Sequence, residues 1–167
     1  NETVARHLED ESVPALFRAH EPLDPVKVAE FEEFIASLGH GLAAPPDAVA
    51  PAHFQRLLER LKGSPEERPV AFLMLRTMQQ ARYDHTNLGH FGLAASSYTH
   101  FTSPIRRYPD LVVHRALRAA RGGRLSEDQR REWTEDLPEI ARHTSERERL
   151  ATDAERELIQ WKKVRFM

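Results

Sequence analysis

The sequence of 167 residues predicts an α+β fold in which helices dominate. Apolar residues recur at helical spacing in several segments, and residues 137–166 read as one long helix with a polar surface. Two short stretches within residues 90–102 are rich in aromatic and β-branched residues, which favours strands. We therefore expect several helices, a short β hairpin near residues 90–102 and a long C-terminal helix, all in a single unit over residues 1–167.

Helices are predicted first in the N-terminal half. Residues 1–10 carry a weak helical signal. Asp24 and Pro25 are typical of a helix start, and Gly39 is typical of a helix end. Between them one apolar stripe is formed by Val28, Phe31, Phe34, Ile35 and Leu38. After an Ala- and Pro-rich loop over residues 41–50, a second helical stripe consists of Phe54, Leu57, Leu58 and Leu61.

The next predicted helix follows a capping-box pattern, Ser64-Pro65-Glu66-Glu67. Pro69 is expected to kink or restart this helix. Its apolar residues are Val70, Leu73, Met74, Met78 and Ala81. The predicted strands at 90–94 and 98–102 come next, with residues 95–97 as the hairpin loop.

A Ser-Pro pair predicts the start of another helix, which runs to about Ala120, where Gly122-Gly123 ends it. Ser103 is a favoured N-cap residue, and Pro104 suits the first helical position, where its missing N–H costs nothing. Pro109 lies inside the predicted helix and should bend or split its first turn.

This predicted helix start has the features of an anion site. The amides of Ile105 and Arg106 would have no intrahelical partner, and the guanidinium groups of Arg106 and Arg107 stand beside them. Free amides, the positive end of the helix dipole and two Arg forks favour a phosphate or a carboxylate. For Arg106 we favour an anion contact over a structural salt bridge, because it lies in the first turn.

The predicted helix after Ser103 has two faces. An apolar stripe faces the core, namely Val112, Val113, Ala116, Leu117 and Ala120. The opposite face carries Arg107, Asp110, His114 and Arg118. Two interpretations stay open for that face. It is either a solvated surface with an Asp110–His114 pair worth a few tenths of a kcal/mol, or part of a binding surface.

The C-terminal helix places a carboxylate on its apolar side. Its apolar arc consists of Leu150, Ala151, Ala154, Leu158 and Trp161, and Glu155 projects beside that arc. Such a carboxylate must reach solvent, pair with a cation or face a polar cavity. The sequence leaves two interpretations: burial against an arginine of another helix, or a role at a substrate channel.

Composition excludes several classes of protein. The formal net charge is −2, so any nucleic-acid surface must be local. The chain has no cysteine, which fits a reducing compartment, and no apolar run approaches the roughly 20 residues of a membrane span. We therefore expect no membrane association. The spacing of His90, His100 and His114 matches no zinc pattern, and we predict no metal ligands in this chain.

One long motif resembles a known family. His90-Phe91-Gly92-Leu93 is followed by Tyr98-Thr99-His100-Phe101-Thr102-Ser103-Pro104-Ile105-Arg106-Arg107-Tyr108-Pro109-Asp110-Leu111 and then His114-Arg115. This run closely resembles the signature of the RNB catalytic domain of the ribonuclease II and ribonuclease R exoribonucleases. The Arg-Arg-Tyr-Pro-Asp-Leu form is more similar to bacterial ribonuclease R. Weaker similarity extends over essentially the whole chain.

The resemblance implies processive, hydrolytic degradation of RNA from the 3′ end, with release of nucleoside 5′-monophosphates and Mg²⁺ as cofactor. It implies that Arg106 is catalytic and contacts the scissile phosphate. It also implies that Glu155 lies near the terminal nucleotides. The full set of residues that we expect to bind substrate is Thr102, Ser103, Arg107, Tyr108, His114 and Glu155.

The resemblance also implies what lies elsewhere. The aspartates that hold the metal in this family precede the position numbered 1 here, so this chain resembles the C-terminal half of an RNB domain. We expect its partners to be RNA and the N-terminal half of that domain, its location to be cytoplasmic, and the chain alone to be inactive. The alternative is a noncatalytic helical module that binds RNA or an acidic partner, and a third option is a purely structural protein.

Overall fold

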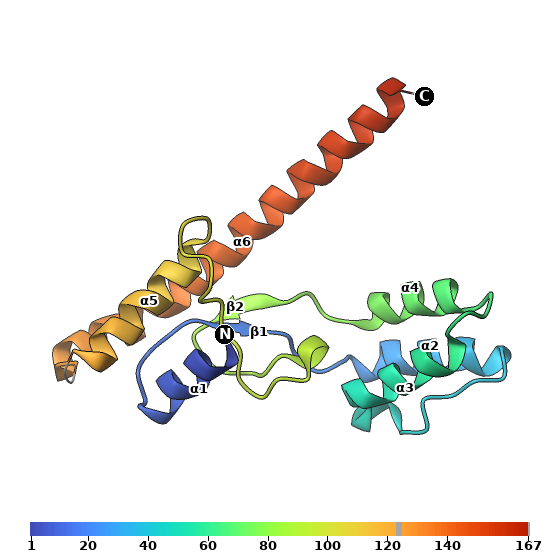
Figure 1. The fold of residues 1–167 in the computed structure, drawn as a ribbon, viewed down its shortest axis with the longest axis horizontal. Helices are drawn as coiled ribbons and strands as arrows, with labels where there is room; N and C mark the ends of the chain where they lie inside the picture. The colour runs from blue at the N-terminus through green and yellow to red at the C-terminus, as the bar shows by residue number, and fades with distance from the viewer. Residues whose placement is uncertain (123–124, 167) are drawn as a thin grey trace. The chain divides into compact units, whose positions relative to one another are not determined.

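The computed structural model describes residues 1–122 and 125–166 (Figure 1). Within this part of the chain it contains six α-helices, two short 3₁₀ helices and one two-stranded antiparallel sheet, which confirms the helix-dominated α+β class. Contacts divide the chain into two compact units. Unit 1 comprises Asn1–Ala19, Arg82–Asn87 and the residues from Ser97 on, and unit 2 comprises His20–Ala81 and Leu88–Ser96. The expectation that residues 1–167 belong to one domain stays a prediction.

Unit 2 is helical and follows the sequence prediction closely. It contains α2 (Pro25–Ser37), the 3₁₀ helix η1 (Pro46–Ala48), α3 (Pro51–Leu61), α4 (Glu67–Thr77) and the 3₁₀ helix η2 (Phe91–Leu93). The Asp24 carboxylate caps α2 by accepting a hydrogen bond from the Val26 amide at 2.9 Å. The buried side chains of its core are Leu23, Val28, Phe31, Ile35, Leu42, Phe54, Leu57, Leu61, Val70 and Met74.

The predicted capping box before α4 does not form. The N-cap residue is Glu66, whose side chain makes no capping hydrogen bond, and the Glu67 carboxylate accepts a hydrogen bond from the Gly63 amide at 2.7 Å instead. The helix therefore starts later than the Ser64 pattern predicts. Pro69 consequently lies in the first turn of α4, where its missing N–H removes no intrahelical bond.

Unit 1 contains α1 (Glu2–Asp10), β1 (Phe17–Ala19), β2 (Arg82–Asp84), α5 (Tyr108–Arg121) and α6 (Glu127–Phe166). The two strands pair in the register Phe17↔Asp84, Arg18↔Tyr83 and Ala19↔Arg82. Helix α6 packs on β2, because the Ser145 hydroxyl accepts a hydrogen bond from the Tyr83 amide at 2.9 Å. The buried core of the unit consists of Ala5, Leu8, Val13, Ala15, Leu16, Phe17, Tyr83, Val112, Val113, Ala116, Leu137 and Ala141.

The strands lie elsewhere than the sequence predicts, so the placement of a hairpin at residues 90–102 is wrong. Residues 91–93 form η2, and His90 forms isolated β-bridges with His20 and Ala95. Residues 98–102 form no strand, and their backbone is bonded to separate parts of the chain. The Tyr98 carbonyl accepts from the Arg18 amide at 2.8 Å, and the Phe101 amide donates to the Asn1 side chain at 3.1 Å. The aromatic and β-branched residues at 98–102 therefore belong to a loop that is held by hydrogen bonds, and not to a strand.

The helix after the Ser-Pro pair begins at Tyr108, so the prediction that Ser103 is its N-cap residue is wrong. Residues 104–106 form a turn in which the Arg107 amide donates to the Ser103 carbonyl at 3.1 Å. Pro109 explains the late start, because a proline inside a helix removes a hydrogen bond and clashes with the preceding turn, whereas a proline in the first turn costs nothing. Pro109 occupies that early position in α5.

The end of α5 agrees with the sequence prediction, and α6 is longer than predicted. Helix α5 ends at Arg121 with Gly122 as its C-cap residue, and Gly123 lies outside the described residues. Helix α6 is confirmed as a long C-terminal helix of 40 residues, and it begins ten residues before the predicted Leu137.

Candidate functional site

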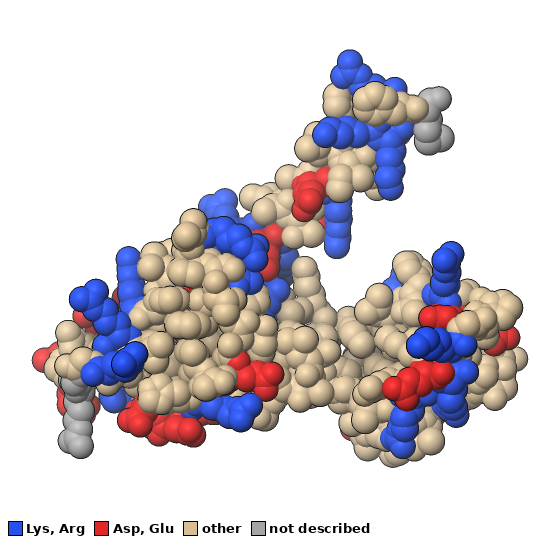
Figure 2. Space-filling view, viewed as in Figure 1, with Lys and Arg blue, Asp and Glu red and all other residues tan. Residues whose placement is uncertain are grey.

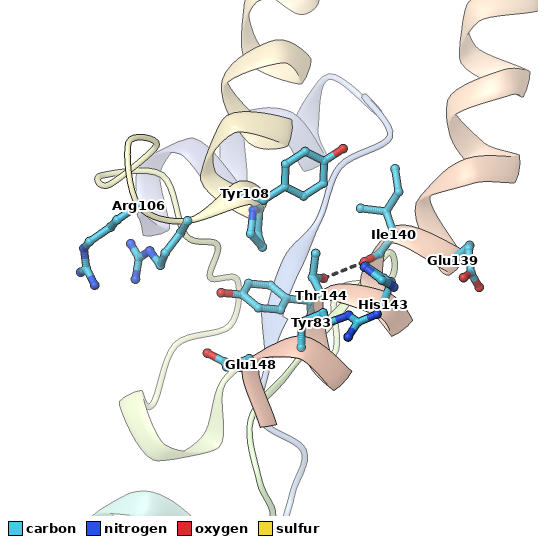
Figure 3. Close-up of a pocket in the computed structure, with 11 residues that line it drawn as sticks. Tyr83, Arg106, Tyr108, Glu139, Ile140, His143, Thr144 and Glu148 are labelled. Atoms are coloured by element: carbon cyan, nitrogen blue, oxygen red, sulfur yellow. Dashed lines mark hydrogen bonds between the residues drawn. The ribbon is translucent and has the colours of Figure 1, made fainter. Parts of the chain in front are cut away.

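A pocket of about 750 Å³ opens in unit 1 between the start of α5 and the middle of α6 (Figure 3). Strand β2 contributes Tyr83 to its lining, and the turn before α5 together with the first residues of that helix contributes residues 106–109. Helix α6 contributes the remaining side chains, namely Glu139, Ile140, His143, Thr144, Arg147 and Glu148. The pocket therefore includes three of the predicted site residues, Arg106, Arg107 and Tyr108.

Arg107 and Asp110 form the central ion pair of this region. Arg107 Nη2 donates a hydrogen bond to Asp110 Oδ1 at 2.8 Å, and Arg107 Nε lies 2.8 Å from Asp110 Oδ2. The carboxylate is completely buried. It also accepts a hydrogen bond from the Ser103 amide at 2.7 Å, so it ties both ends of the turn to α5. Arg107 is thus committed to a protein partner, and the predicted Asp110–His114 pair does not form.

Arg106 differs from its neighbour. It is exposed on the turn, and within the described residues its guanidinium makes no ion pair or hydrogen bond. In Figure 3 its side chain points away from the labelled residues of α6. Among the described residues Arg106 forms no structural salt bridge, and its contact with an anion stays a prediction. The amides predicted beside it are no helix terminus, because α5 starts after this turn.

His114 is held by the loop before α5. Its ring stacks on Phe101 with a centroid distance of 4.1 Å and an interplanar angle of 10°. Its Nε2 lies 2.9 Å from the Phe101 carbonyl oxygen, a hydrogen-bond distance. Of the other two predicted residues in this loop, Thr102 is exposed and Ser103 is half-buried. Neither lines the pocket, so the structure brings only part of the predicted set together.

Tyr83 forms the floor of the pocket. Its hydroxyl lies 2.9 Å from His100 Nδ1, and the guanidinium of Arg18 lies over its ring at 4.7 Å from the centroid. Burial, with a smaller contribution from the nearby Glu148 carboxylate, raises the pKa of Tyr83 to about 12. The phenol is therefore neutral at physiological pH.

The pocket has an excess of positive charge once the ion pairs are counted. Glu148 is neutralised by Arg18, whose Nη1 lies 2.6 Å from Oε2. Glu139 shares Arg142, which lies outside the pocket, with Glu146; each carboxylate lies 2.6 Å from the guanidinium, and the hydrogen bond from Arg142 lowers the pKa of the Glu139 carboxyl. The arginines left without a carboxylate partner among the described residues are Arg106 and Arg147. A chain with a formal net charge of −2 therefore has a pocket in which, among the described residues, two guanidinium groups have no carboxylate partner.

Glu155 lies apart from this pocket. It is exposed on the distal part of α6, and the buried pairing with an arginine does not form among the described residues. The apolar arc on this part of the helix is also exposed, with Leu150 at 60%, Leu158 at 51% and Trp161 at 56%. Figure 2 shows Lys and Arg side chains near the end of α6. A role for Glu155 at a substrate channel stays a prediction.

Sequence reasoning missed the α6 wall of the pocket. His143 and Arg147 line it, and neither was predicted as a site residue. The available signal was spacing: Glu139, His143 and Arg147 follow one another at intervals of four and therefore share one helix face. The same spacing is found on ordinary solvated helix surfaces. It indicates a site only in the folded structure, where β2 and the start of α5 line the same pocket.

The described carboxylates and histidines form no metal-binding group. Within residues 1–122 and 125–166 no group of three His, Asp or Glu side chains is placed to hold a metal ion. Two buried carboxylates of unit 1 are already engaged, Asp84 with Arg82 and Asp110 with Arg107. No helix in this part of the chain is long and apolar enough to cross a lipid bilayer.

Comparisons with known proteins agree with the motif. The model of the RNB domain family matches residues 1–122. Ribonuclease R 1 of Lactococcus lactis subsp. lactis (strain IL1403) is 45% identical over 167 residues, which is 100% of this chain and 20% of that protein. The chain thus spans about a fifth of the length of this curated relative.

Solved structures show the same fold. Mycoplasma genitalium RNase R in complex with ribose-methylated single-stranded RNA superimposes with a TM-score of 0.89 at 29% identity, over 96% of this chain and 26% of that chain. Yeast Ssd1, described as a pseudonuclease, superimposes with a TM-score of 0.70 at 28% identity, over 87% of this chain and 18% of that chain.

Proposed function

Since this chain belongs to the RNB domain family, we propose that the natural protein containing it is a hydrolytic exoribonuclease, which degrades RNA from the 3′ end and releases nucleoside 5′-monophosphates. The observation that carries this proposal is the 45% identity to a ribonuclease R over the full length of the chain. A structural neighbour that is an RNase R in complex with single-stranded RNA supports RNA as the substrate.

In this proposal Arg106 binds the scissile phosphate. Its guanidinium is exposed and free of carboxylates, and the turn that carries it is fixed by the buried Asp110. A planar guanidinium can donate two parallel hydrogen bonds to phosphoryl oxygens, on which negative charge grows during hydrolysis. A rigid turn keeps the guanidinium in place, so little reorganisation is needed when the phosphate arrives.

The other predicted residues divide by their contacts. Tyr108 is exposed beside Arg106 and offers a ring face to RNA, and Thr102 offers a hydroxyl. Arg107, Ser103 and His114 are held by protein partners, and we assign them to shaping the turn and loop around the substrate. Glu155 contributes through the distal part of α6, where the RNA channel of the whole protein would run.

Magnesium does not fit the side chains of this chain. Within the described residues the carboxylates of unit 1 form no cluster, and Mg²⁺ prefers several oxygen ligands gathered in one place. We propose that the metal is held by the N-terminal half of the RNB domain, that this half is the partner of the chain in a cytoplasmic enzyme, and that the chain alone does not hydrolyse RNA.

A noncatalytic RNA-binding module is the second candidate. Yeast Ssd1 shares the fold and is described as a pseudonuclease, so an RNB fold can exist without nuclease activity. The two candidates differ in turnover. The module would bind RNA with the same dependence on salt but would release no mononucleotides.

The test uses the full-length natural protein and a single-stranded RNA with a 3′ hydroxyl, in the presence of Mg²⁺. We expect wild type to release 5′-monophosphates. Arg106→Ala should lower kcat by a factor of about 10² to 10³, the usual effect of removing one group that stabilises transition-state charge. Arg106→Lys keeps the positive charge but loses the two parallel hydrogen bonds of the guanidinium, so its kcat should lie between those of wild type and Arg106→Ala. Arg121→Ala, an exposed arginine near the end of α5, is the control. Binding without turnover in wild type would support the module instead.

A further inference from the structure

We propose that the pocket between Tyr108 and α6 is a nucleotide subsite, in which a base stacks on the Tyr108 ring and its phosphate binds Arg147. This inference rests on the proposed function for the nature of the ligand, RNA. It adds a binding wall on α6 that neither the motif nor the predicted site residues include.

The size and lining of the pocket fit a nucleotide. Its volume of about 750 Å³ falls within the range of small-molecule sites, about 300 to 1,000 Å³. Figure 3 shows the ring of Tyr108 above that of Tyr83, with Ile140, His143 and Thr144 of α6 alongside. Such a mixture of aromatic, aliphatic and polar groups is typical of sites that hold a flat, polar ring.

The two tyrosines have different roles. The Tyr83 side chain is buried, and both its hydroxyl and its ring face are occupied, by His100 and Arg18. The Tyr108 side chain is 50% exposed and lies in the first turn of α5. Tyr108 therefore has a ring face free for a base, and Tyr83 closes the pocket beneath it. Bases of any sequence stack on such rings, because every base has a π face.

Charge selects the phosphate contact. Glu148 and Glu139 line the pocket but are held by Arg18 and Arg142. Arg107 is held by Asp110. Among the described side chains that line the pocket, Arg147 is therefore the arginine of α6 whose guanidinium has no carboxylate to neutralise it. An exposed, unpaired guanidinium beside a stacking ring suits the phosphate of the same nucleotide.

The position of Arg147 also separates it from Arg106. Arg106 also lines the pocket, but it belongs to the turn before α5, and its side chain points away from the labelled α6 side chains in Figure 3. Arg147 belongs to α6 itself. Two arginines that have no carboxylate partner among the described residues, on different elements of unit 1, suit two different phosphates of one strand, so their effects should be separable by mutation.

The test measures binding of a short single-stranded RNA with a 3′ hydroxyl to the full-length protein, without divalent cations, over a range of salt concentrations. Arg147→Gln should reduce the slope of log K against log salt by about 0.7, the value for one phosphate contact on a single strand. The matched control is Arg131→Gln, which removes an exposed arginine of the same helix that lies outside the pocket and has no carboxylate partner among the described residues. It should leave the slope unchanged.

A second pair of variants tests the stacking contact. Tyr108→Phe keeps the ring and should bind RNA within about two-fold of wild type, whereas Tyr108→Leu should bind about ten-fold more weakly, since one base–aromatic stack is lost. Equal slopes for Arg147→Gln and Arg131→Gln, or equal binding of the two Tyr108 variants, would overturn the subsite.

The outcome is separable from that of the proposed function. If Arg106→Ala abolishes turnover while Arg147→Gln binds RNA as wild type does, the subsite is wrong and the exoribonuclease stands. If wild type releases no mononucleotides but Arg147→Gln lowers the salt slope by about 0.7 relative to wild type, the subsite stands and the exoribonuclease is wrong.

Discussion

The Asp110 carboxylate holds the Arg107 guanidinium at 2.8 Å while it is itself completely inaccessible to solvent. The same carboxylate accepts the Ser103 amide at 2.7 Å. One buried charge therefore connects the first turn of α5 with both ends of the turn that carries Arg106. The exposed, unpaired state of Arg106 depends on this neighbour, because Arg107 rather than Arg106 neutralises the buried carboxylate.

Asp110→Ala should destabilise the protein by about 3 to 5 kcal/mol, since it leaves the Arg107 cation and the Ser103 amide without their partner. Asp110→Asn should cost less, because an amide oxygen can still accept from Ser103. Urea unfolding of the full-length protein measures both. Glu135→Ala removes an exposed carboxylate of α6 and should stay within about 0.5 kcal/mol of wild type. An Asp110→Ala protein as stable as the Glu135→Ala protein would show that the buried pair is unimportant.

Gly92→Ala should destabilise unit 2 by about 1 to 3 kcal/mol, through overpacking. A Cβ at Gly92 would lie 2.8 Å from Nδ1 of the buried His20, the atom that accepts a hydrogen bond from the Gly92 amide. Gly41→Ala is the matched control, since a Cβ there would meet no atom within 4 Å. Thermal unfolding compares the two variants, and equal midpoints would contradict the predicted clash.

His114→Ala should lower the free energy of unfolding by about 1 to 3 kcal/mol, because it removes both the stack on Phe101 and the contact with its carbonyl. His114→Phe keeps a ring for the stack and should lie between alanine and wild type. RNA affinity, measured under conditions where both variants are folded, should change little. A large loss of affinity with unchanged stability would instead assign His114 directly to the substrate.

Asp84 should make the free energy of unfolding depend on pH in the acidic range. Burial raises the pKa of this carboxyl, but hydrogen bonds from the Thr86 amide and from Arg82 outweigh burial, so the pKa lies below its ordinary value of 3.8. The native state then binds its proton less tightly than the unfolded state. The stabilisation is fully present at neutral pH and is lost as the pH falls below about 4 through the folded-state pKa. Urea midpoints of Asp84→Asn should therefore fall less steeply with acid than those of wild type, and parallel curves would exclude this contribution.

The sequence predicted the helices of unit 2 because their signals are local. The Asp24-Pro25 start, the Gly39 stop and an apolar stripe at helical spacing all lie within one segment, and α2 has these features in the structure. The strands could not be predicted in the same way. Each has three residues, and they pair across more than 60 positions, so no local pattern marks them.

The candidate site was predictable only in part for a similar reason. Ser103 and Pro104 carry every local mark of a helix start, but Pro109 and the buried Asp110 decide where α5 begins. The exposed Arg106 could be singled out from its motif. The α6 wall could not, because the contribution of His143 and Arg147 depends on β2 and α5 facing that helix.

The pairing of Ala19 with Arg82 means that the chain leaves the sheet of unit 1 and re-enters it at adjacent positions. The segment of residues 20–81 between the two strands can therefore change in length without altering the strand register. Each doubling of such a segment adds only about 0.6 kcal/mol to the closure free energy. Insertions and deletions should accordingly accumulate in the surface loops of residues 20–81 during evolution, and this segment is the natural place to graft foreign sequence.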